Sequence, residues 1–445
     1  MTRRDGGTVI FGLGVTGLSL VRFLHGREPL TVVDTRQDPP NLARARAEYP
    51  DVRYVCGDAG RATLSEASRI VVSPGLALDH CWLRAAVAAG VPLESDISLF
   101  LAAAAAPVIG ITGTNGKSTV TALVGRLLEA AGLDVGVGGN IGEPALDLLA
   151  PSRDAYVLEL SSFQLERLAE PAIDAASILN VTPDHLDRYP DMAAYAASKQ
   201  TIYARCRVAV CNRDDRLTRP AREVARLESV GLDAPPHDDD WGIVVGRGAR
   251  RFAHGTRALL DCGAVRLRGR HNEFNVLAAL ALAATRVELD DRVLDALAAF
   301  EGLPHRCVVV GMVDGIAFID DSKATNLGAC LAALEGLGDA ARRHIVLIAG
   351  GDAKGADLSP LHDPVKRFVR HVVTLGRDAE RVEAAIGATP HIRVADMAEA
   401  VVAAHRAARD GDVVLLSPAC SSLDMFRNYE ARGDAFTAAV QRLGT

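Results

Sequence analysis

The stretch from Val108 to Thr119 reads VIGITGTNGKST, and the fold is best predicted from it. Its first residues are a short apolar run, which predicts a buried strand, and residues 117–131 have the spacing of a helix. Glycines between them let backbone N–H groups approach a polyphosphate, and the helix N-terminus adds a partial positive charge. Lys117 would reach the outer phosphates, while the hydroxyl of Ser118 or Thr119 would bind Mg²⁺. The stretch therefore predicts an ATP-binding phosphate loop in an α/β domain.

This loop departs from the general P-loop pattern in one respect. Five residues separate Gly110 from Gly116, where that pattern has four. A glycine-rich turn with an incidental lysine is the alternative, but the order of strand, GKST and helix argues against it. The loop does not identify the phosphate acceptor, since kinases, motors and ligases all use ATP.

A second glycine loop, Gly12-Leu13-Gly14-Val15-Thr16-Gly17, lies near the start of the chain. It follows a predicted strand at residues 8–11 and opens a predicted helix at residues 17–25. Asp34 comes about twenty residues later, after the next apolar run, as in a dinucleotide-binding fingerprint. Taken alone, this pattern favours an NAD-dependent oxidoreductase, with a glycine turn that binds no ligand as the alternative.

Apolar runs and helical segments alternate along the 445 residues, and such a chain is too long for one ordinary core. We expect an α/β protein of three domains with a boundary near Gly302. They are a Rossmann-like N-terminal domain (1–95), a central P-loop ATPase-like domain with a mostly parallel sheet (96–302) and a Rossmann-like C-terminal domain (303–445). A long helix is expected at residues 272–285. The other predicted strands are residues 30–33, 70–73, 91–93, 156–160, 176–179, 208–211, 308–311, 316–319, 345–349, 372–375 and 413–416.

The composition is that of a globular protein without a large basic surface. Apolar residues make up 49% and charged residues 24%, and the formal net charge is −7, which argues against a nucleic-acid partner. The longest apolar run, residues 97–111, is short for a membrane span and is broken by Pro107 and Gly110. Eight cysteines without a CxxC pair favour free thiols in a reducing cytosol. Since MTRRDGG leads directly into a strand, we expect neither an export signal nor a membrane partner.

The loop TGTNGKST resembles the ATP loop of the Mur ligases and of the related folylpolyglutamate synthases. Further segments, across nearly the whole chain, are similar to the branch of the Mur ligase family that adds glutamate. DSKATN matters most, because the branches that add the first and third residues differ there. The segments that carry the resemblance are ELSSFQL (159–165), NVTPDHLDRY (180–189), His271-Asn272 with Asn275, DSKATN (321–326), GGDAKGAD (350–357) and SPACSSLDMF (417–426).

The resemblance implies an ATP-dependent amide ligase that adds glutamate to UDP-N-acetylmuramoyl-L-alanine, a cytoplasmic step of peptidoglycan precursor synthesis. ATP would phosphorylate the alanine carboxylate, because a free carboxylate is a poor electrophile, and the glutamate amine would then attack the acyl phosphate. ADP and phosphate would be released. The resemblance also implies two Mg²⁺ ions and a monomeric enzyme. D- or L-glutamate and folate-type polyglutamylation stay open at this stage.

The resemblance also gives the first glycine loop a ligand other than NAD. It implies that this pocket takes the uridine diphosphate end of the sugar nucleotide, because N–H groups and a helix N-terminus bind any diphosphate. Gly75 in SPGLAL would face this ligand, and Asn140 in GGNIG would face the reacting groups. The implied sugar-nucleotide residues are Gly14, Val15, Thr16, Asp34, Thr35, Arg36, Gly75 and Asn140.

Four residues are expected to carry the chemistry: Lys117, Glu159, His185 and Lys199. Glu159 lies at the end of a predicted strand, where its carboxylate would hold Mg²⁺ directly or through water. His185 would bind a second metal ion or orient the incoming amine. Taken alone, Glu159 and His185 are ordinary solvated or hydrogen-bonded residues, and Lys199 is a surface lysine. In the family the lysine at the place of Lys199 is carbamylated. The resemblance therefore implies a carbamate at Lys199 that supports the second Mg²⁺, with Ser118, Glu159 and His185 as the other metal-binding residues.

The third domain is expected to close over ATP, because strand-end loops of open α/β sheets meet at one edge. Asn272 and Asn275 share a helix face and suit an adenine edge, although Asn272 could instead cap that helix. The implied ATP-binding residues are Gly113, Thr114, Asn115, Gly116, Lys117, Ser118, Thr119, Asn272, Asn275, Arg306, Asp321 and Lys323.

Glutamate carries two carboxylates, so its site needs a cation and hydroxyl donors. The resemblance implies Thr325, Lys354, Ser422, Leu423 and Tyr429 for this site. Tyr429 stands where the family often has phenylalanine, and ACSS stands where ACAS is usual.

Overall fold

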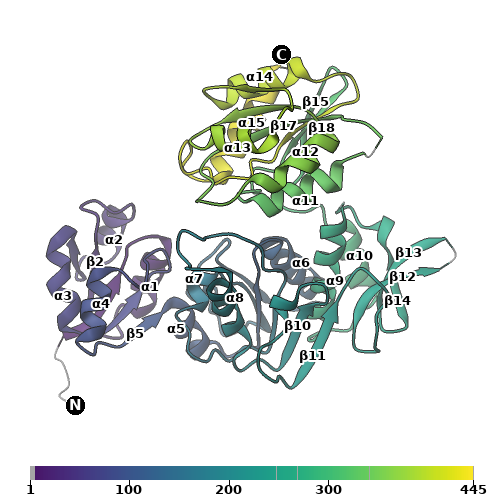
Figure 1. Ribbon diagram of the computed structural model, residues 1–445. Coiled ribbons are helices and arrows are strands. Elements are labelled where there is room, and N and C mark those ends of the chain that lie inside the picture. Colours follow the sequence, from purple (N-terminus) through teal and green to yellow (C-terminus); the bar gives the residue numbers. More distant parts are fainter. Residues whose placement is uncertain (1–5, 247, 268, 340, 444–445) are drawn as a thin grey trace.

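The computed structural model describes residues 6–246, 248–267, 269–339 and 341–443. Three β-sheets with flanking helices follow one another along the chain (Figure 1). The first unit, purple to blue, lies beside the central unit, and the third unit, green to yellow, lies above it in this view. The predicted three-part α/β fold is confirmed. Within the described residues no helix is long and apolar enough to span a membrane.

The N-terminal unit is a parallel five-stranded sheet with the strand order β3-β2-β1-β4-β5. Its glycine loop joins β1 to α1. A Cβ on Gly17 would lie 2.0 Å from the carbonyl oxygen of Gly12, so only glycine lets the helix approach the loop this closely. The elements are β1 (Gly6–Phe11), α1 (Val15–Leu24), β2 (Leu30–Asp34), α2 (Leu42–Glu48), β3 (Arg53–Cys56), α3 (Gly60–Glu66), β4 (Ala67–Val72), α4 (Cys81–Ala88) and β5 (Leu93–Ser95).

The central unit has a nine-stranded sheet with the order β14-β13-β12-β11-β10-β9-β6-β8-β7. β6 lies inside this sheet between β9 and β8 and is buried along its length. α6 and α9 pack together in one core, so the phosphate loop emerges at the carboxyl end of a buried strand. The elements up to β10 are α5 (Asp96–Ala103), β6 (Val108–Thr112), α6 (Lys117–Ala130), β7 (Val135–Gly139), β8 (Ala155–Glu159), α7 (Ser162–Leu165), β9 (Ala175–Ile178), α8 (Met192–Gln200) and β10 (Val208–Asn212).

The far edge of the central sheet is an antiparallel meander that the sequence analysis did not predict. β12, β13 and β14 pair antiparallel, whereas β11 continues the parallel part beside β10. β11, β13 and β14 carry arginines and are partly exposed, so they lack the continuous apolar runs of the buried strands, whereas β12 reads WGIVVG. The remaining elements are β11 (Arg226–Val230), β12 (Trp241–Gly246), β13 (Ala249–His254), β14 (Arg257–Asp261), α9 (Arg270–Ala284) and α10 (Asp291–Ala299).

The C-terminal unit has a six-stranded sheet with the order β15-β16-β20-β17-β18-β19, in which only β15 runs antiparallel. Its inner parallel strands are mostly buried between helices on both faces, whereas the edge strand β19 is exposed. The elements are β15 (Val308–Val313), β16 (Ile316–Asp320), α11 (Leu327–Leu337), β17 (Ile345–Gly350), α12 (His362–Phe368), β18 (Val369–Leu375), α13 (Ala379–Ile386), β19 (His391–Arg393), α14 (Met397–Ala407), β20 (Val413–Leu416) and α15 (Tyr429–Leu443).

Polar contacts fix the N-terminal unit on the central unit. From α1, Ser19 Oγ donates to Asp147 Oδ1 at 2.9 Å, and the Arg22 guanidinium lies 2.7 Å from the same oxygen. At the start of α5, Asp96 Oδ2 accepts a long hydrogen bond of 3.5 Å from Gln164 Nε2. Asp96 Oδ1 is buried and has no partner within the described residues. Burial raises the pKa of Asp96 to about 6.

The buried Asp96 carboxyl predicts a pH-dependent stability. Its folded pKa lies above the unfolded value of about 3.9, so the folded state binds more protons between pH 4 and pH 6. Stability from this group therefore falls as the pH rises through that window. In Asp96→Asn this component is absent, and the stability of the variant relative to wild type should rise by on the order of 2 kcal/mol between pH 4 and pH 7.

Thermal unfolding of both proteins across this pH range measures the difference, with Asp79→Asn, at an exposed aspartate of the same unit, as the control. A difference between Asp96→Asn and wild type that is constant with pH would contradict the prediction.

Candidate functional site

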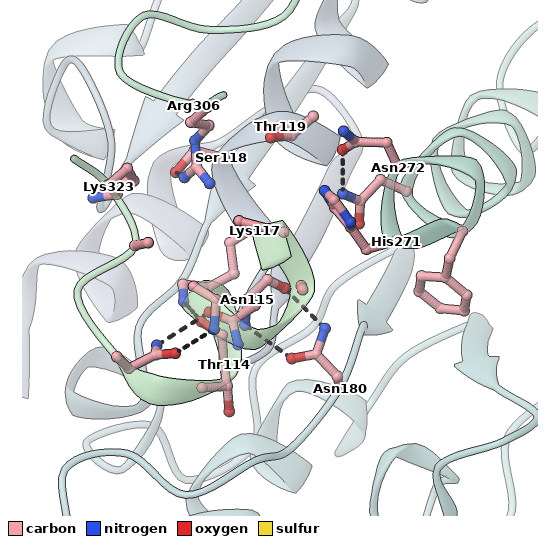
Figure 2. A pocket seen from close by; sticks show the side chains of 18 of the residues that line it. Thr114, Asn115, Lys117, Ser118, Thr119, Asn180, His271, Asn272, Arg306 and Lys323 are labelled. Atoms are coloured by element: carbon pink, nitrogen blue, oxygen red, sulfur yellow. Dashed lines mark hydrogen bonds between the residues drawn. The ribbon is translucent and has the colours of Figure 1, made fainter. Parts of the chain in front are cut away.

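A cavity of about 510 Å³ lies between the central and C-terminal units. It opens at the carboxyl ends of the central strands, where loops of parallel sheets meet. Figure 2 shows Lys117 and Ser118 of the phosphate loop together with Lys323 and with Arg306, which lies beside Ser118. The predicted site residues that line it are Thr114, Asn115, Gly116, Lys117, Ser118, Thr119, Asn140, Glu159, His185, Asn272, Asn275, Arg306, Asp321, Lys323, Thr325 and Lys354.

The phosphate loop is held in its conformation by Asn180, which lies in the loop after β9. Asn180 Oδ1 accepts from the N–H of Asn115 at 2.8 Å, and Asn180 Nδ2 donates to the carbonyl of Asn115 at 3.0 Å (Figure 2). Gly116 has a φ of +84°, and a Cβ there would lie 2.5 Å from Asn275 Oδ1. The loop is therefore preorganised, and glycine at position 116 is required both by the backbone conformation and by space.

Lys117 begins α6, and its ammonium group is turned back onto the loop. Nζ donates to the carbonyls of Gly113 at 2.9 Å and of Thr114 at 2.7 Å. Burial lowers the pKa of Lys117 below its usual value. A phosphate oxygen would be a stronger partner than these carbonyls, because hydrogen bonds between ions are the strong ones.

Glu159 ends β8 and is buried beside Asn140. Its Oε1 accepts from Asn140 Nδ2 at 2.7 Å. Its Oε2 is buried and finds no hydrogen-bond partner in the part of the chain that the structure describes. An unpaired buried carboxylate oxygen is costly unless a ligand completes it, and Mg²⁺ is held in proteins by one or two carboxylates together with substrate phosphates. Glu159 therefore fits a magnesium ion.

The described residues alone do not complete a metal site. In the described ranges no group of three or more His, Cys, Asp or Glu side chains could hold a metal ion. A magnesium ion here would need further oxygen ligands, which Ser118 and a bound triphosphate would offer.

His185 has a φ of +55° and lies in the loop after β9. Its ring packs edge-on against Phe163 with 4.8 Å between centroids. Burial lowers the pKa of His185 to about 4, so the imidazole is neutral at neutral pH. A neutral imidazole can bind a metal ion or accept a proton.

Lys199 is buried, which excludes the surface-lysine interpretation. Its side chain is 1% exposed, and Nζ donates to the carbonyl of Gly113 at 3.0 Å. Nζ also lies 4.4 Å from the centroid of the Tyr195 ring. Burial and the nearby charge of Lys117 lower the pKa of Lys199 well below its usual value. A neutral amine is the form that reacts with CO₂, so the surroundings of Lys199 favour carbamylation.

The start of α9 forms the opposite end of the cavity. Asn275 Nδ2 donates to Asn272 Oδ1 at 3.1 Å (Figure 2). The N-cap of this helix is Gly269, so the alternative that Asn272 caps the helix is wrong: Asn272 lies within its first turn. His271 lies beside the two amides and also lines the cavity.

Contacts between units close the cavity from the C-terminal side. Arg306 Nη2 donates to Ser118 Oγ at 2.8 Å. Asn326 Nδ2 donates to Asn115 Oδ1 at 3.1 Å and to Asp184 Oδ2 at 3.2 Å. Lys354 Nζ lies 3.4 Å from Asp184 Oδ1. The two units therefore meet directly at the phosphate loop.

The sequence analysis missed Asn180, Asp184 and Asn326 as site residues. All three stand inside the quoted segments NVTPDHLDRY and DSKATN, so position within those segments was the available signal. Although burial favours the neutral acid, the charge of Lys354 and the hydrogen bond from Asn326 contribute to a pKa of Asp184 below its usual value. Asp184 therefore offers the C-terminal unit an anion to bind.

The DSKATN loop presents a carboxyl and an ammonium group to the cavity. Asp321 Oδ2 accepts from Ser417 Oγ at 2.8 Å, and burial raises the pKa of Asp321 to about 7. Lys323 Nζ lies 3.8 Å from the ring centroid of Tyr429. Burial lowers the pKa of Lys323 to about 8.

Of the five residues predicted to bind the substrate glutamate, only some line the cavity. Thr325 and Lys354 line it, whereas Ser422, Leu423 and Tyr429 do not. Leu423 is 70% exposed, and Tyr429 begins α15 beneath Lys323.

The predicted sugar-nucleotide residues lie apart from this cavity, except Asn140. In the N-terminal unit, Asp34 Oδ2 accepts from the N–H of Leu13 at 2.7 Å, and both its oxygens accept from Arg36. Burial opposes ionisation of Asp34, yet these hydrogen bonds hold its pKa below the usual value. The Asp34 carboxylate therefore fixes the glycine loop and holds the Arg36 side chain beside it.

Three family models match the chain in succession. They are the Mur ligase MurD-like N-terminal domain at residues 6–95, the Mur ligase middle domain at residues 111–283 and the Mur ligase glutamate ligase domain at residues 305–420.

Among similar proteins, the UDP-N-acetylmuramoylalanine–D-glutamate ligase of Pseudomonas aeruginosa is 49% identical over 438 residues, which cover 98% of both chains. A protein of the same name from Shewanella oneidensis is 47% identical over 98% of both chains. Another from Legionella pneumophila is 44% identical over 98% of this chain and 99% of its own. Among solved structures, a pseudomurein peptide ligase type C from Methanothermus fervidus has a TM-score of 0.63 at 17% sequence identity. The UDP-N-acetylmuramate-alanine ligase from Thermotoga maritima has a TM-score of 0.62 at 17% sequence identity. Each covers 98% of this chain and 99% of its own. These two show a shared fold.

Proposed function

Because this chain belongs to the Mur ligase family, we propose that it joins D-glutamate to UDP-N-acetylmuramoyl-L-alanine, with ATP converted to ADP and phosphate. This is a step of peptidoglycan precursor synthesis. The observation that carries the function is the 49% identity, over 98% of both chains, to a ligase with this name. The cavity between the phosphate loop and the DSKATN loop supports it, because it joins a triphosphate site to a second unit.

In this reaction an oxygen of the alanine carboxylate attacks the γ-phosphorus of ATP, ADP leaves, and an acyl phosphate forms. The amine of glutamate then attacks the carbonyl carbon, and phosphate leaves with the amide formed. Lys117 would hold the outer phosphates, and Arg306, which donates to Ser118 Oγ from the C-terminal unit, would meet them there as well. Phosphoryl transfer depends on such positioning and charge neutralisation.

Glu159, Ser118 and His185 would hold Mg²⁺, which when bound neutralises phosphate charge. The support for Glu159 is its unpaired buried oxygen, and the support for His185 is its neutral imidazole. We assign a carbamate to Lys199, supported by its burial and its lowered pKa. The carbamate would turn a buried cation into an anion beside the phosphate loop and thereby suit a second Mg²⁺.

Adenine is assigned to the amides of Asn272 and Asn275, and the sugar nucleotide to the N-terminal glycine loop with Asp34, Thr35, Arg36 and Gly75. The remaining ATP residues are those of the phosphate loop with Asp321 and Lys323. Glutamate is assigned to Thr325 and Lys354, with Ser422, Leu423 and Tyr429 as further candidates. These last three would need the C-terminal unit to move relative to the cavity seen here.

Three further properties belong to the same proposal. The chain would divide into functional domains at residues 1–95, 96–302 and 303–445. It would act in the cytoplasm, where UDP-linked precursors are made, and it would act as a monomer without a membrane or nucleic-acid partner.

Replacement of Lys354 tests the glutamate site. Its ammonium group pairs with Asp184 at 3.4 Å without ligand and would exchange this partner for a substrate carboxylate. In Lys354→Met the KM for D-glutamate should rise about 10- to 100-fold, since a charge-assisted hydrogen bond is lost. The KM for ATP should change much less. Steady-state kinetics measure both constants, with Lys366→Met at an exposed lysine of α12 as the control. An unchanged KM for glutamate would remove Lys354 from the site.

Product analysis tests the proposed function itself. The purified protein is incubated with MgATP, UDP-N-acetylmuramoyl-L-alanine and either D- or L-glutamate, and the products are identified by mass spectrometry. We expect one new amide only with D-glutamate. Product with L-glutamate alone, or none with either, would refute the assignment.

A further inference from the structure

Arg167 lies between the central unit and the loop that follows β4 of the N-terminal unit. Its guanidinium donates to the carbonyl of Val72, at the end of β4, at 3.4 Å and to two carbonyls of that loop, Pro74 at 3.3 Å and Leu76. These carbonyls come from a segment more than ninety positions earlier in the chain. Arg167 is part-buried there, and no residue of the proposed reaction explains it.

The contacts of Arg167 set the direction of the peptide groups in the loop. In a trans peptide the C=O and the following N–H point to opposite sides. Because the carbonyl of Pro74 points at Arg167, the N–H of Gly75 points away from it. Gly75 is exposed, and a Cβ on it would meet no atom within 4 Å. The loop therefore carries an exposed glycine beside the first glycine loop, with its N–H turned away from Arg167.

The same loop touches the glycine loop of the N-terminal unit. The N–H of Ser73 donates to the carbonyl of Phe11 at 2.9 Å. A Cβ on Gly12 would lie 2.9 Å from Ser73 Cβ and 3.1 Å from Leu76 Cδ1. The loop held by Arg167 thus packs directly against the glycine loop to which the sugar nucleotide is assigned.

On its other side Arg167 is tied to the catalytic side of the central unit. Its Nε donates to the carbonyl of Phe163 at 2.9 Å, in the short helix α7 that follows Glu159. The ring of Phe163 contacts His185. A single guanidinium therefore connects residues 72–76 of the N-terminal unit to the segment that follows Glu159.

From this geometry we propose that Arg167 is a positioning residue for the sugar nucleotide. It orients the peptide groups of residues 72–76 so that they bind the sugar nucleotide, and it fixes that pocket relative to Glu159 and His185. The inference rests on the proposed function, because it names the residue that prepares the pocket for that substrate. Arg167 therefore contributes to the affinity for the sugar nucleotide and not to the chemical step.

Kinetics of Arg167→Met test the proposal, since methionine keeps much of the length and loses the five donors. We expect the KM for UDP-N-acetylmuramoyl-L-alanine to rise about tenfold or more, while the KM for ATP and kcat change less than about twofold. Arg167→Lys keeps the charge but cannot reach all three carbonyls, so its KM should lie between those of Arg167→Met and wild type. Arg153→Met is the control, because Arg153 also donates to carbonyls of the central unit, at Leu148 and Val135, but at the opposite ends of the strands.

Three results would overturn the role of Arg167. They are a wild-type KM for the sugar nucleotide in either variant, an equal rise in the KM for ATP, and a rise in the Arg153→Met control as large as in Arg167→Met. Binding of uridine diphosphate to the wild-type protein, measured by calorimetry, separates this inference from the proposed function. If the wild type neither binds uridine diphosphate nor uses the sugar nucleotide, the proposed function fails. If the wild type does both and Arg167→Met is unchanged, only the inference fails.

Discussion

Replacement of Lys117 by alanine is expected to lower kcat by about a thousandfold or more, because the cation that meets the outer phosphates is removed. The ammonium group is buried at the N-terminal end of α6 and is held by two carbonyls of its own loop. A buried charge of this kind acts in a low dielectric, where it stabilises developing negative charge more than a solvated one does. Single-turnover measurements at saturating MgATP would separate this loss from weaker ATP binding.

The control for this variant is Lys366→Ala, which removes an exposed lysine from α12 and should leave kcat unchanged. The far-ultraviolet circular dichroism and the thermal unfolding temperature of Lys117→Ala should stay close to wild type, because the loop is held independently by Asn180. An alanine variant that joins the two substrates at the wild-type rate would exclude Lys117 from phosphoryl transfer.

Replacement of Lys199 by alanine is expected to abolish turnover, again by at least about a thousandfold. If Lys199 carries a carbamate, the variant loses an anion that balances the cations of the phosphate loop. Mass spectrometry of the intact wild-type protein under mild conditions should show a form heavier by one CO₂, and this form should be absent from Lys199→Ala. The fold should persist, since the bond from Nζ to the carbonyl of Gly113 is one of several that hold the loop.

Bicarbonate distinguishes a carbamate from a plain buried lysine. Wild-type protein that has been depleted of CO₂ should lose activity and regain it when bicarbonate is added, together with the mass of one CO₂. Activity that stays full after depletion, with no heavier form detected, would leave Lys199 as an unmodified residue. An active Lys199→Ala variant would remove the residue from the mechanism altogether.

The phosphate loop could be predicted from the sequence because all its determinants are local. The apolar run at residues 108–111, the glycines and Lys117 lie within one short segment, and their meaning depends on spacing alone. The same holds for the first glycine loop and for most buried strands. In the antiparallel meander, β13 and β14 were missed because partly exposed strands lack that continuous apolar signal, whereas β12 does have an apolar run.

Contacts between units could not be predicted in this way. Asn326 donates to Asn115 across 211 positions, and Arg306 donates to Ser118 across 188. Such pairs depend on how two separately folded sheets meet, and neither spacing nor composition specifies that. The burial of Lys199 is a similar case, because a lysine on a helix of ordinary composition gives no sign that it faces the core.

The central claim is that ATP activates the alanine carboxylate as an acyl phosphate within this cavity. UDP-N-acetylmuramoyl-L-alanine with oxygen-18 in its alanine carboxylate tests it directly, because the oxygen that attacks phosphorus leaves with the phosphate when the amide forms. The account predicts that the inorganic phosphate released in the presence of D-glutamate carries one labelled oxygen. Unlabelled phosphate, or phosphate released at the same rate without the sugar nucleotide, would contradict it.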